Sequence, residues 1–150
     1  ARAAKAAGCT VCLNAAPYRP MPEALRAATD IVIVNALEAE TLCGVAVSDR
    51  NSAREAAAAL LAGFPMAVVT AGGDGGAGAM RETENFSVAA LPVELVSTHG
   101  AGDVFVGVLV AALAAGHGFR AGVEAANEAA ARHVSTRRSA AAAGTGRVLT

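Results

Sequence analysis

The residues best suited to chemistry lie at the start of the most apolar segment of the chain. Gly100-Ala101-Gly102-Asp103 lead into an apolar run that predicts a helix over Ala101–Ala115. Small residues at a helix start leave backbone N–H groups uncovered, and these groups have no partner within the helix. With the partial positive charge of the helix terminus they form an anion site, suited to charge on a transferring phosphoryl group. Asp103 lies in the first turn, where its carboxylate could take a proton from a hydroxyl nucleophile.

A structural interpretation of the same motif stands beside the catalytic one. The two glycines would permit a tight turn, and Asp103 would be a favourable negative charge in the first turn of a helix. Short glycine motifs recur by chance, so this motif alone does not decide between the two interpretations.

Polar residues and glycines also follow two buried strands. Ile31-Val32-Ile33-Val34 and Met66–Thr70 are apolar, largely β-branched runs of the kind found in strands buried on both faces. Asn35 follows the first run, and Gly72-Gly73-Asp74-Gly75-Gly76 follows the second. Because ligands gather at the carboxyl ends of parallel strands, these residues and the segment 98–103 are predicted to meet at one site.

The elements around these motifs predict the fold. Buried strands that alternate with helices indicate an α/β fold, with a mostly parallel sheet flanked by helices. Further helices are expected at Leu37–Cys43, Ser52–Ala62 and about Ala121–Ser135, and shorter strands at Thr10–Asn14, Gly78–Arg81, Phe86–Ala89 and Val93–Val96.

Composition excludes several function classes. A formal net charge of −1 and an aromatic content of 3% argue against binding to nucleic acid or to a membrane surface. No apolar run of about 18 residues predicts a transmembrane helix. Three cysteines make no disulfide framework, and Cys9 and Cys12 are expected on opposite faces of one strand. A cytoplasmic location is therefore expected.

The segment Ser97–Phe105 resembles the second signature of the PfkB (ribokinase-like) carbohydrate kinases. In that family a D-T-x-G-A-G-D segment builds an anion hole and supplies the catalytic aspartate. Further segments resemble the family in the same order along the chain: Asn14-Ala15-Ala16-Pro17, then Asn35-Ala36-Leu37-Glu38-Ala39-Glu40 with Gly44, then Thr70-Ala71-Gly72-Gly73-Asp74-Gly75, and finally Asn127. The resemblance covers most of residues 11–138.

This resemblance implies ATP-dependent phosphoryl transfer to a hydroxyl of a sugar or related small polyol. Asp103 would be the base, and the backbone of Gly100, Ala101 and Gly102 would hold the phosphoryl oxygens. The residues implied on the nucleotide side are Asn35, Glu38, Thr70, Gly72, Gly75 and Asn127. Glu38 would reach Mg²⁺ through water, since magnesium usually keeps several waters. From the residues alone, Asn35 and Glu38 also fit a helix N-cap and its capping box.

The chain departs from the family pattern at several positions. Ser97 stands where the family has an aspartate that helps to hold a monovalent cation. The family also tends to have a glycine near Arg138 and Ser139, in the loop that closes this cation site, and this chain has none at either position. Serine carries no charge, so the sequence argues against potassium activation. His99 is unusual for the family. It could face the phosphates or the substrate, but we expect it to be packed or to face solvent. His133 is expected to be an ordinary residue of a late helical turn.

By this resemblance, residues 1–150 form the C-terminal nucleotide-binding and catalytic part of a ribokinase-like domain. The N-terminal half, which holds the sugar in this family, and the β-sheet lid would be missing. A homodimer or another chain that supplies this half would then be the expected partner. The alternative function is a truncated, non-catalytic remnant that binds nucleotide or pairs with a partner. A Rossmann dehydrogenase is the weakest interpretation, since no G-x-G-x-x-G follows the first strand.

Overall fold

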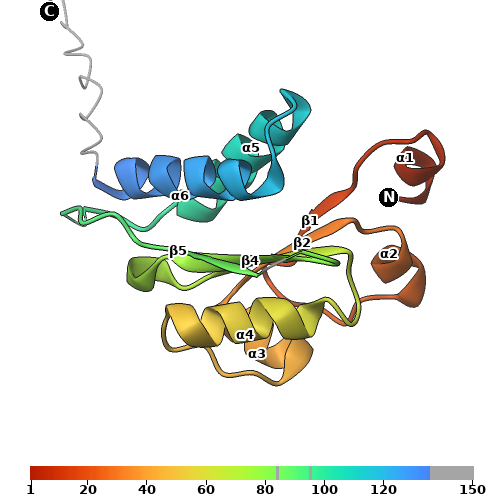
Figure 1. Ribbon diagram of the computed structural model, residues 1–150, viewed down its shortest axis with the longest axis horizontal. Coiled ribbons are helices and arrows are strands. Elements are labelled where there is room, and N and C mark those ends of the chain that lie inside the picture. Colours follow the sequence, from red (N-terminus) through yellow and green to blue (C-terminus); the bar gives the residue numbers. More distant parts are fainter. Residues whose placement is uncertain (84, 95, 136–150) are drawn as a thin grey trace, which may run out of the picture.

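A single five-stranded sheet lies between two layers of helices (Figure 1). The computed structural model describes residues 1–83, 85–94 and 96–135. The helices are α1 (Arg2–Ala6), α2 (Glu23–Ala27), α3 (Ala36–Cys43), α4 (Arg50–Leu60), α5 (Ala101–Ala114) and α6 (Phe119–Ser135), with a short 3₁₀ helix η1 (Gly72–Asp74). The strands are β1 (Cys12–Asn14), β2 (Ile31–Asn35), β3 (Met66–Thr70), β4 (Gly76–Met80) and β5 (Phe86–Val88).

The strands lie in the sheet in the order in which they occur along the chain. β1 pairs with β2 and β2 with β3 in parallel, whereas β4 runs antiparallel to both β3 and β5. Four strands therefore point in one direction and only β4 is reversed. This arrangement confirms the predicted α/β fold with a mostly parallel sheet.

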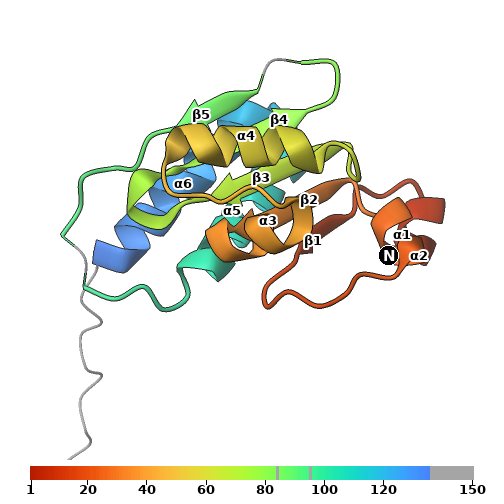
Figure 2. The same cartoon turned by 90° about the horizontal axis from the view of Figure 1, so that it is seen from below.

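Helices bury both faces of the sheet, and successive residues of a strand point to opposite faces. On one face Val32 and Val34 pack in a core with α4, and on the other Ile31 and Ile33 pack in a core with α5 and α6. Figure 1 shows α3 and α4 on one side of the sheet and α5 and α6 on the other. In Figure 2, α4 lies across β3 and β4. The continuous β-branched runs are thus explained by burial on both sides.

The ends of α3 follow the local signals of the sequence. Asn35 accepts the Glu38 N–H at 3.0 Å, and the Glu38 carboxylate accepts the Asn35 N–H at 2.9 Å. These two bonds are the predicted capping box, and Gly44 ends the helix in a left-handed conformation with φ of 76°. The structural interpretation of Asn35 and Glu38 is therefore confirmed.

Two predicted strands are wrong in position or extent. No strand forms at Val93, Glu94 or Val96, where Val93 is 39% exposed and the backbone has no strand partner. The first strand contains only Cys12–Asn14, so Cys9 lies outside it and the argument from opposite strand faces does not apply. β-branched residues favour strands only where a neighbouring strand supplies hydrogen bonds and packing.

Other features of the chain bear on location and redox chemistry. Cys9, Cys12 and Cys43 are all free thiols. Within the described residues, none of the helices has the length and apolarity needed to cross a bilayer. Arg138 and Ser139, where the sequence lacks the glycine of the family pattern, lie outside the described residues.

Candidate active site

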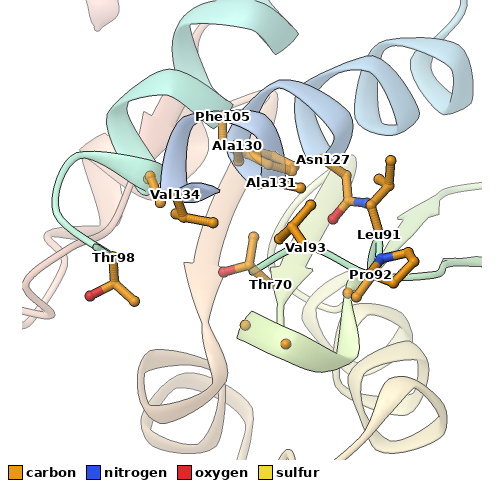
Figure 3. Close-up of a pocket in the computed structure, with 16 residues that line it drawn as sticks. Thr70, Leu91, Pro92, Val93, Thr98, Phe105, Asn127, Ala130, Ala131 and Val134 are labelled. Carbon is orange, nitrogen blue, oxygen red and sulfur yellow. The ribbon is translucent and has the colours of Figure 1, made fainter. Parts of the chain in front are cut away.

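A cavity of about 460 Å³ opens where α5 and α6 meet the carboxyl end of β3. Its volume falls within the range of about 300–1,000 Å³ that is usual for small-molecule sites. The sixteen lining residues shown in Figure 3 are Thr70, Gly72, Gly73, Gly75, Ala90, Leu91, Pro92, Val93, Thr98, Ala101, Gly102, Phe105, Asn127, Ala130, Ala131 and Val134. None of these residues is charged, so any anion held here would be bound by backbone and neutral side-chain groups.

The cavity has two chemically different ends. In Figure 3, Leu91, Pro92 and Asn127 lie at one end, whereas Thr98 lies at the other. The first end is largely apolar, and the second is next to the first turn of α5, which contributes Gly102. An elongated ligand with an apolar ring and an anionic tail would match this division.

The start of α5 offers unpaired backbone donors. Gly100 is the N-cap residue with φ of 79°, a left-handed conformation that favours glycine. The Ala101 N–H donates to the Thr98 carbonyl at 3.3 Å, and the first intrahelical bond runs from the Val104 N–H to the Gly100 carbonyl at 3.0 Å. The N–H groups of Gly100, Gly102 and Asp103 form no hydrogen bond with any described part of the chain. They remain available to an anion, and the helix dipole adds a charge of about +0.5 there.

The glycine loop after β3 forms the floor of the cavity. The Ala71 N–H donates to the Gly75 carbonyl at 2.8 Å, which closes the loop around η1. A Cβ atom at Gly75 would lie 2.1 Å from the Val88 carbonyl oxygen, so only glycine lets the loop pack this closely against β5. The predicted nucleotide residues Thr70, Gly72 and Gly75 all line the cavity.

Asn35 and Glu38 lie beside the cavity rather than in its wall. Asn35 is aligned with Thr70 in the β2–β3 pairing, so both residues stand at the same edge of the sheet. Glu38 is only 5% exposed, and its carboxylate is engaged in the capping box. The two residues are therefore near the predicted site. Their side-chain oxygens already accept hydrogen bonds from backbone N–H groups at the start of α3.

Asp103 also lies outside the cavity wall. It is exposed in the first turn of α5, two residues before Phe105, which does line the cavity. Residues two apart in a helix project in nearly opposite directions, so Asp103 and Phe105 lie on different sides of α5. The start of α5 thus has the cavity on one side and the Asp103 carboxylate on another.

Asn127 belongs to the cavity wall and also has a structural partner. Its Nδ2 donates to the Ala89 carbonyl at 2.9 Å, which ties α6 to the chain just after β5. This bond fixes the side chain and leaves its oxygen without a donor among the described residues. The oxygen is therefore free to accept a hydrogen bond from a ligand.

The apolar residues of the cavity wall were not predicted from the sequence, although their neighbours Ala101, Gly102 and Asn127 were. From α6 it uses Asn127, Ala130, Ala131 and Val134, and from α5 and its approach it uses Thr98, Ala101, Gly102 and Phe105. The α6 set follows the i, i+3, i+4, i+7 spacing of a single helical face, whereas Thr98 of the second set lies before α5 begins. This spacing was the signal that could have found the α6 residues, starting from Asn127. Leu91, Pro92 and Val93 had no such signal, because they lie in an irregular segment.

Similar proteins were found by sequence and by structure. Residues 1–144 match the family described as pfkB family carbohydrate kinase. A bifunctional ribokinase/ribose-5-phosphate isomerase A from Fructilactobacillus sanfranciscensis is 36% identical over 111 residues, which are 73% of this chain and 20% of that protein. Ribokinase from Staphylococcus aureus is 34% identical over 111 residues, which are 73% of this chain and 36% of that one.

The fold agrees with this relationship. The structure of Arabidopsis thaliana ribokinase complexed with ribose and ATP matches with a TM-score of 0.81 and 26% identity, over 91% of this chain and 45% of that chain. This chain thus spans less than half the length of each of these three relatives. The family match over nearly the whole sequence, together with the shared fold, leads to one conclusion: this chain belongs to the pfkB family of carbohydrate kinases.

Proposed function

We propose that this chain binds ATP and supplies the catalytic base for phosphorylation of a sugar or small polyol hydroxyl. Residues 1–150 would then form the C-terminal nucleotide-binding and catalytic part of a ribokinase-like domain. The observation that carries the proposal is the cavity in which an apolar end is joined to the unpaired N–H groups at the start of α5. The relative solved with ribose and ATP supports this choice of ligands.

In the proposed complex the adenine ring occupies the apolar end of the cavity, beside Asn127. The phosphates run past Thr70, Gly72 and Gly75 toward the start of α5. There the N–H groups of Gly100, Gly102 and Asp103 hold the γ-phosphoryl oxygens. The Ala101 N–H already has the Thr98 carbonyl as acceptor, so Ala101 contributes chiefly its small size.

The transfer step needs one base and one leaving group. The acceptor hydroxyl oxygen attacks the γ-phosphorus, the bond from that phosphorus to the bridging oxygen breaks, and ADP leaves. Asp103 takes the hydroxyl proton. In such transfers positioning and charge stabilisation do almost all of the catalysis. The free N–H groups at the start of α5 would supply both the positioning and the charge stabilisation.

Magnesium fits this site as a water-mediated ion held mainly by phosphates. The described residues contain no group of three or more His, Cys, Asp or Glu side chains that could hold a metal by themselves. Mg²⁺ commonly uses one or two carboxylates with phosphates and several waters, so Glu38 suffices as the nearby carboxylate. When bound, the ion would neutralise phosphate charge. Glu38 would orient its water ligands.

The substitution Asp103→Asn tests the catalytic assignment. The variant should bind Mg-ATP as tightly as the original chain, while phosphoryl transfer should fall by about 10²–10⁴-fold because the base is lost. The assay is ADP release by the chain complemented with the N-terminal half of a related ribokinase, with binding followed by calorimetry. Glu55→Gln, on the opposite side of the sheet in α4, is the matched control. Full turnover by Asp103→Asn would show that Asp103 is not the base.

A non-catalytic remnant that binds nucleotide or pairs with a partner is the second candidate. It is favoured by Ser97, which stands where the family's second signature has an acidic residue. A complemented chain that binds Mg-ATP and releases no ADP would support it. Titration with NAD in place of Mg-ATP separates both candidates from a dehydrogenase.

A further inference from the structure

The last turn of α6 holds the segment that leads into α5. His133 Nε2 lies 2.9 Å from the His99 carbonyl oxygen. On the same turn, the Val134 carbonyl accepts the Val96 N–H at 2.8 Å and the Ser97 N–H at 3.1 Å. Among the described residues, three hydrogen bonds therefore connect α6 to this segment, and only the one from His133 is made by a side chain.

The His99 carbonyl lies just before the left-handed residue Gly100 at the start of α5. In a helix the N–H of a residue donates to the carbonyl four positions earlier, so this carbonyl is the helical acceptor for Asp103. In the structure it is bound by His133 instead, and α5 starts with the bond from Val104 to Gly100. The Asp103 N–H is left without an acceptor in the described chain.

The imidazole also packs against the turn itself. A Cβ atom at Gly100 would lie 3.2 Å from His133 Nε2, so the ring is in close contact with the left-handed N-cap residue. The same helix contributes Asn127 to the far end of the cavity. One helix thus borders the apolar end of the cavity and also contacts the start of α5.

We propose that His133 is a positioning residue that, by donating to the His99 carbonyl, fixes the start of α5 and keeps its N–H groups open to an anion. The consequence for catalysis rests on the function proposed above. The effect on the start of α5 does not, so the two can be tested separately.

Amide hydrogen exchange in the protein without nucleotide tests the structural part. In His133→Ala, the amides of Ala101 and Val104 should exchange about fivefold faster, which is the effect of one lost hydrogen bond on local opening. The buried core amides of Val68 and Val123 should not change. His133→Gln, which retains an N–H donor, should restore slow exchange, and His117→Ala, another exposed histidine, should behave like the original protein. Unchanged exchange in His133→Ala, or fast exchange in both His133 variants, would overturn the proposal.

Binding of Mg-ATP and of adenosine tests the link to the anion site. His133→Ala should weaken Mg-ATP binding by about tenfold, since the phosphate donors lose their alignment, but leave adenosine binding unchanged. His133→Gln should recover the affinity. An equal loss for both ligands, or none for Mg-ATP, would overturn the positioning role. If the original protein bound neither ligand, the proposed nucleotide function would fail, while the exchange experiment would still decide whether His133 fixes the start of α5.

Discussion

At the cavity, the lack of a side chain matters as much as the functional groups that side chains supply. A Cβ atom at Gly102 would meet nothing within 4 Å, and Gly102 lines the cavity next to the free N–H groups. The space beside Gly102 is therefore left open by the fold and not filled by packing. Under the proposed function the phosphates would occupy it.

The substitution Gly102→Ala should separate ligand binding from stability. Its methyl group would meet no atom within 4 Å in the part of the chain that the structure describes. Alanine also favours helix over glycine, by up to about 1 kcal/mol in a helix interior. We expect a melting temperature that is equal or higher, with Mg-ATP affinity reduced several-fold. Gly107→Ala is the matched control, since Gly107 lies in the same helix, also has open space at its Cβ and does not line the cavity. Equal Mg-ATP affinity in both variants would show that the phosphates do not approach Gly102.

At the scale of elements, short loops between strands and helices position the site. The β3–β4 connection turns within η1 and returns against β5, which brings the glycine loop close to the chain that follows β5. Gly75 makes this possible. Its φ is 93°, and the Val88 carbonyl oxygen occupies the space that a side chain at this position would need. The loop geometry is thus set by backbone packing and needs no ligand.

Gly75→Ala should therefore destabilise the fold. The left-handed conformation and the clash with Val88 together should cost about 3 kcal/mol of unfolding free energy. Gly73→Ala in the same loop should be nearly neutral, because open space surrounds its Cβ position. Chemical denaturation of the two variants measures the difference. Similar stability for both would mean that the loop can move away from β5 at little cost.

The capping box at the start of α3 shows how one pair of residues can serve an element and a site together. Asn35 and Glu38 satisfy each other's backbone N–H groups, so α3 would keep them here even without a nucleotide. Their position beside Thr70 still places them at the edge where ligands gather. A structural role and the proposed role near magnesium are compatible.

At the scale of the whole molecule, the N-terminal segment is attached to the sheet through Asp30. Its carboxylate accepts hydrogen bonds from the Lys5 side chain and from the Val11 N–H, the latter at 2.8 Å. The Asp30 side chain is 14% exposed. Burial raises its pKa, but the hydrogen bonds from Lys5 and Val11 and the charge of Lys5 outweigh burial and leave the pKa below its ordinary value.

Asp30→Asn should therefore reduce stability in a pH-dependent way. Because the pKa is lower in the folded than in the unfolded state, the ionised carboxylate stabilises the fold above about pH 4, and this stabilisation is lost as the pH falls through the folded-state pKa. At pH 7 the variant should be less stable by about 1–2 kcal/mol, and the two proteins should converge in acid. Urea denaturation across pH gives the difference. A constant difference at all pH values would exclude ionisation of Asp30 as its cause.

Several features were predictable from the sequence because local interactions determine them. The β-branched runs predicted the strands that are buried on both faces, and Asn35 with Glu38 predicted the start of α3. The small residues before Asp103 gave the start of α5 with its unpaired N–H groups. In each case the cause lies within a few neighbouring residues: a helix start, a turn or the alternation of side chains. The order of the motifs also identified the family, as the match over residues 1–144 confirms.

Only the tertiary structure decided how these pieces are combined. The segment around Val93, predicted as a strand, instead lines the cavity as irregular chain opposite one face of α6. His133, predicted to be ordinary, bonds to a carbonyl 34 residues earlier. Such contacts join residues far apart in the chain, and they form only when the sheet and its helices pack together. The local sequence therefore determines where a helix can start, while the packing decides which contacts hold that start and which groups face one cavity.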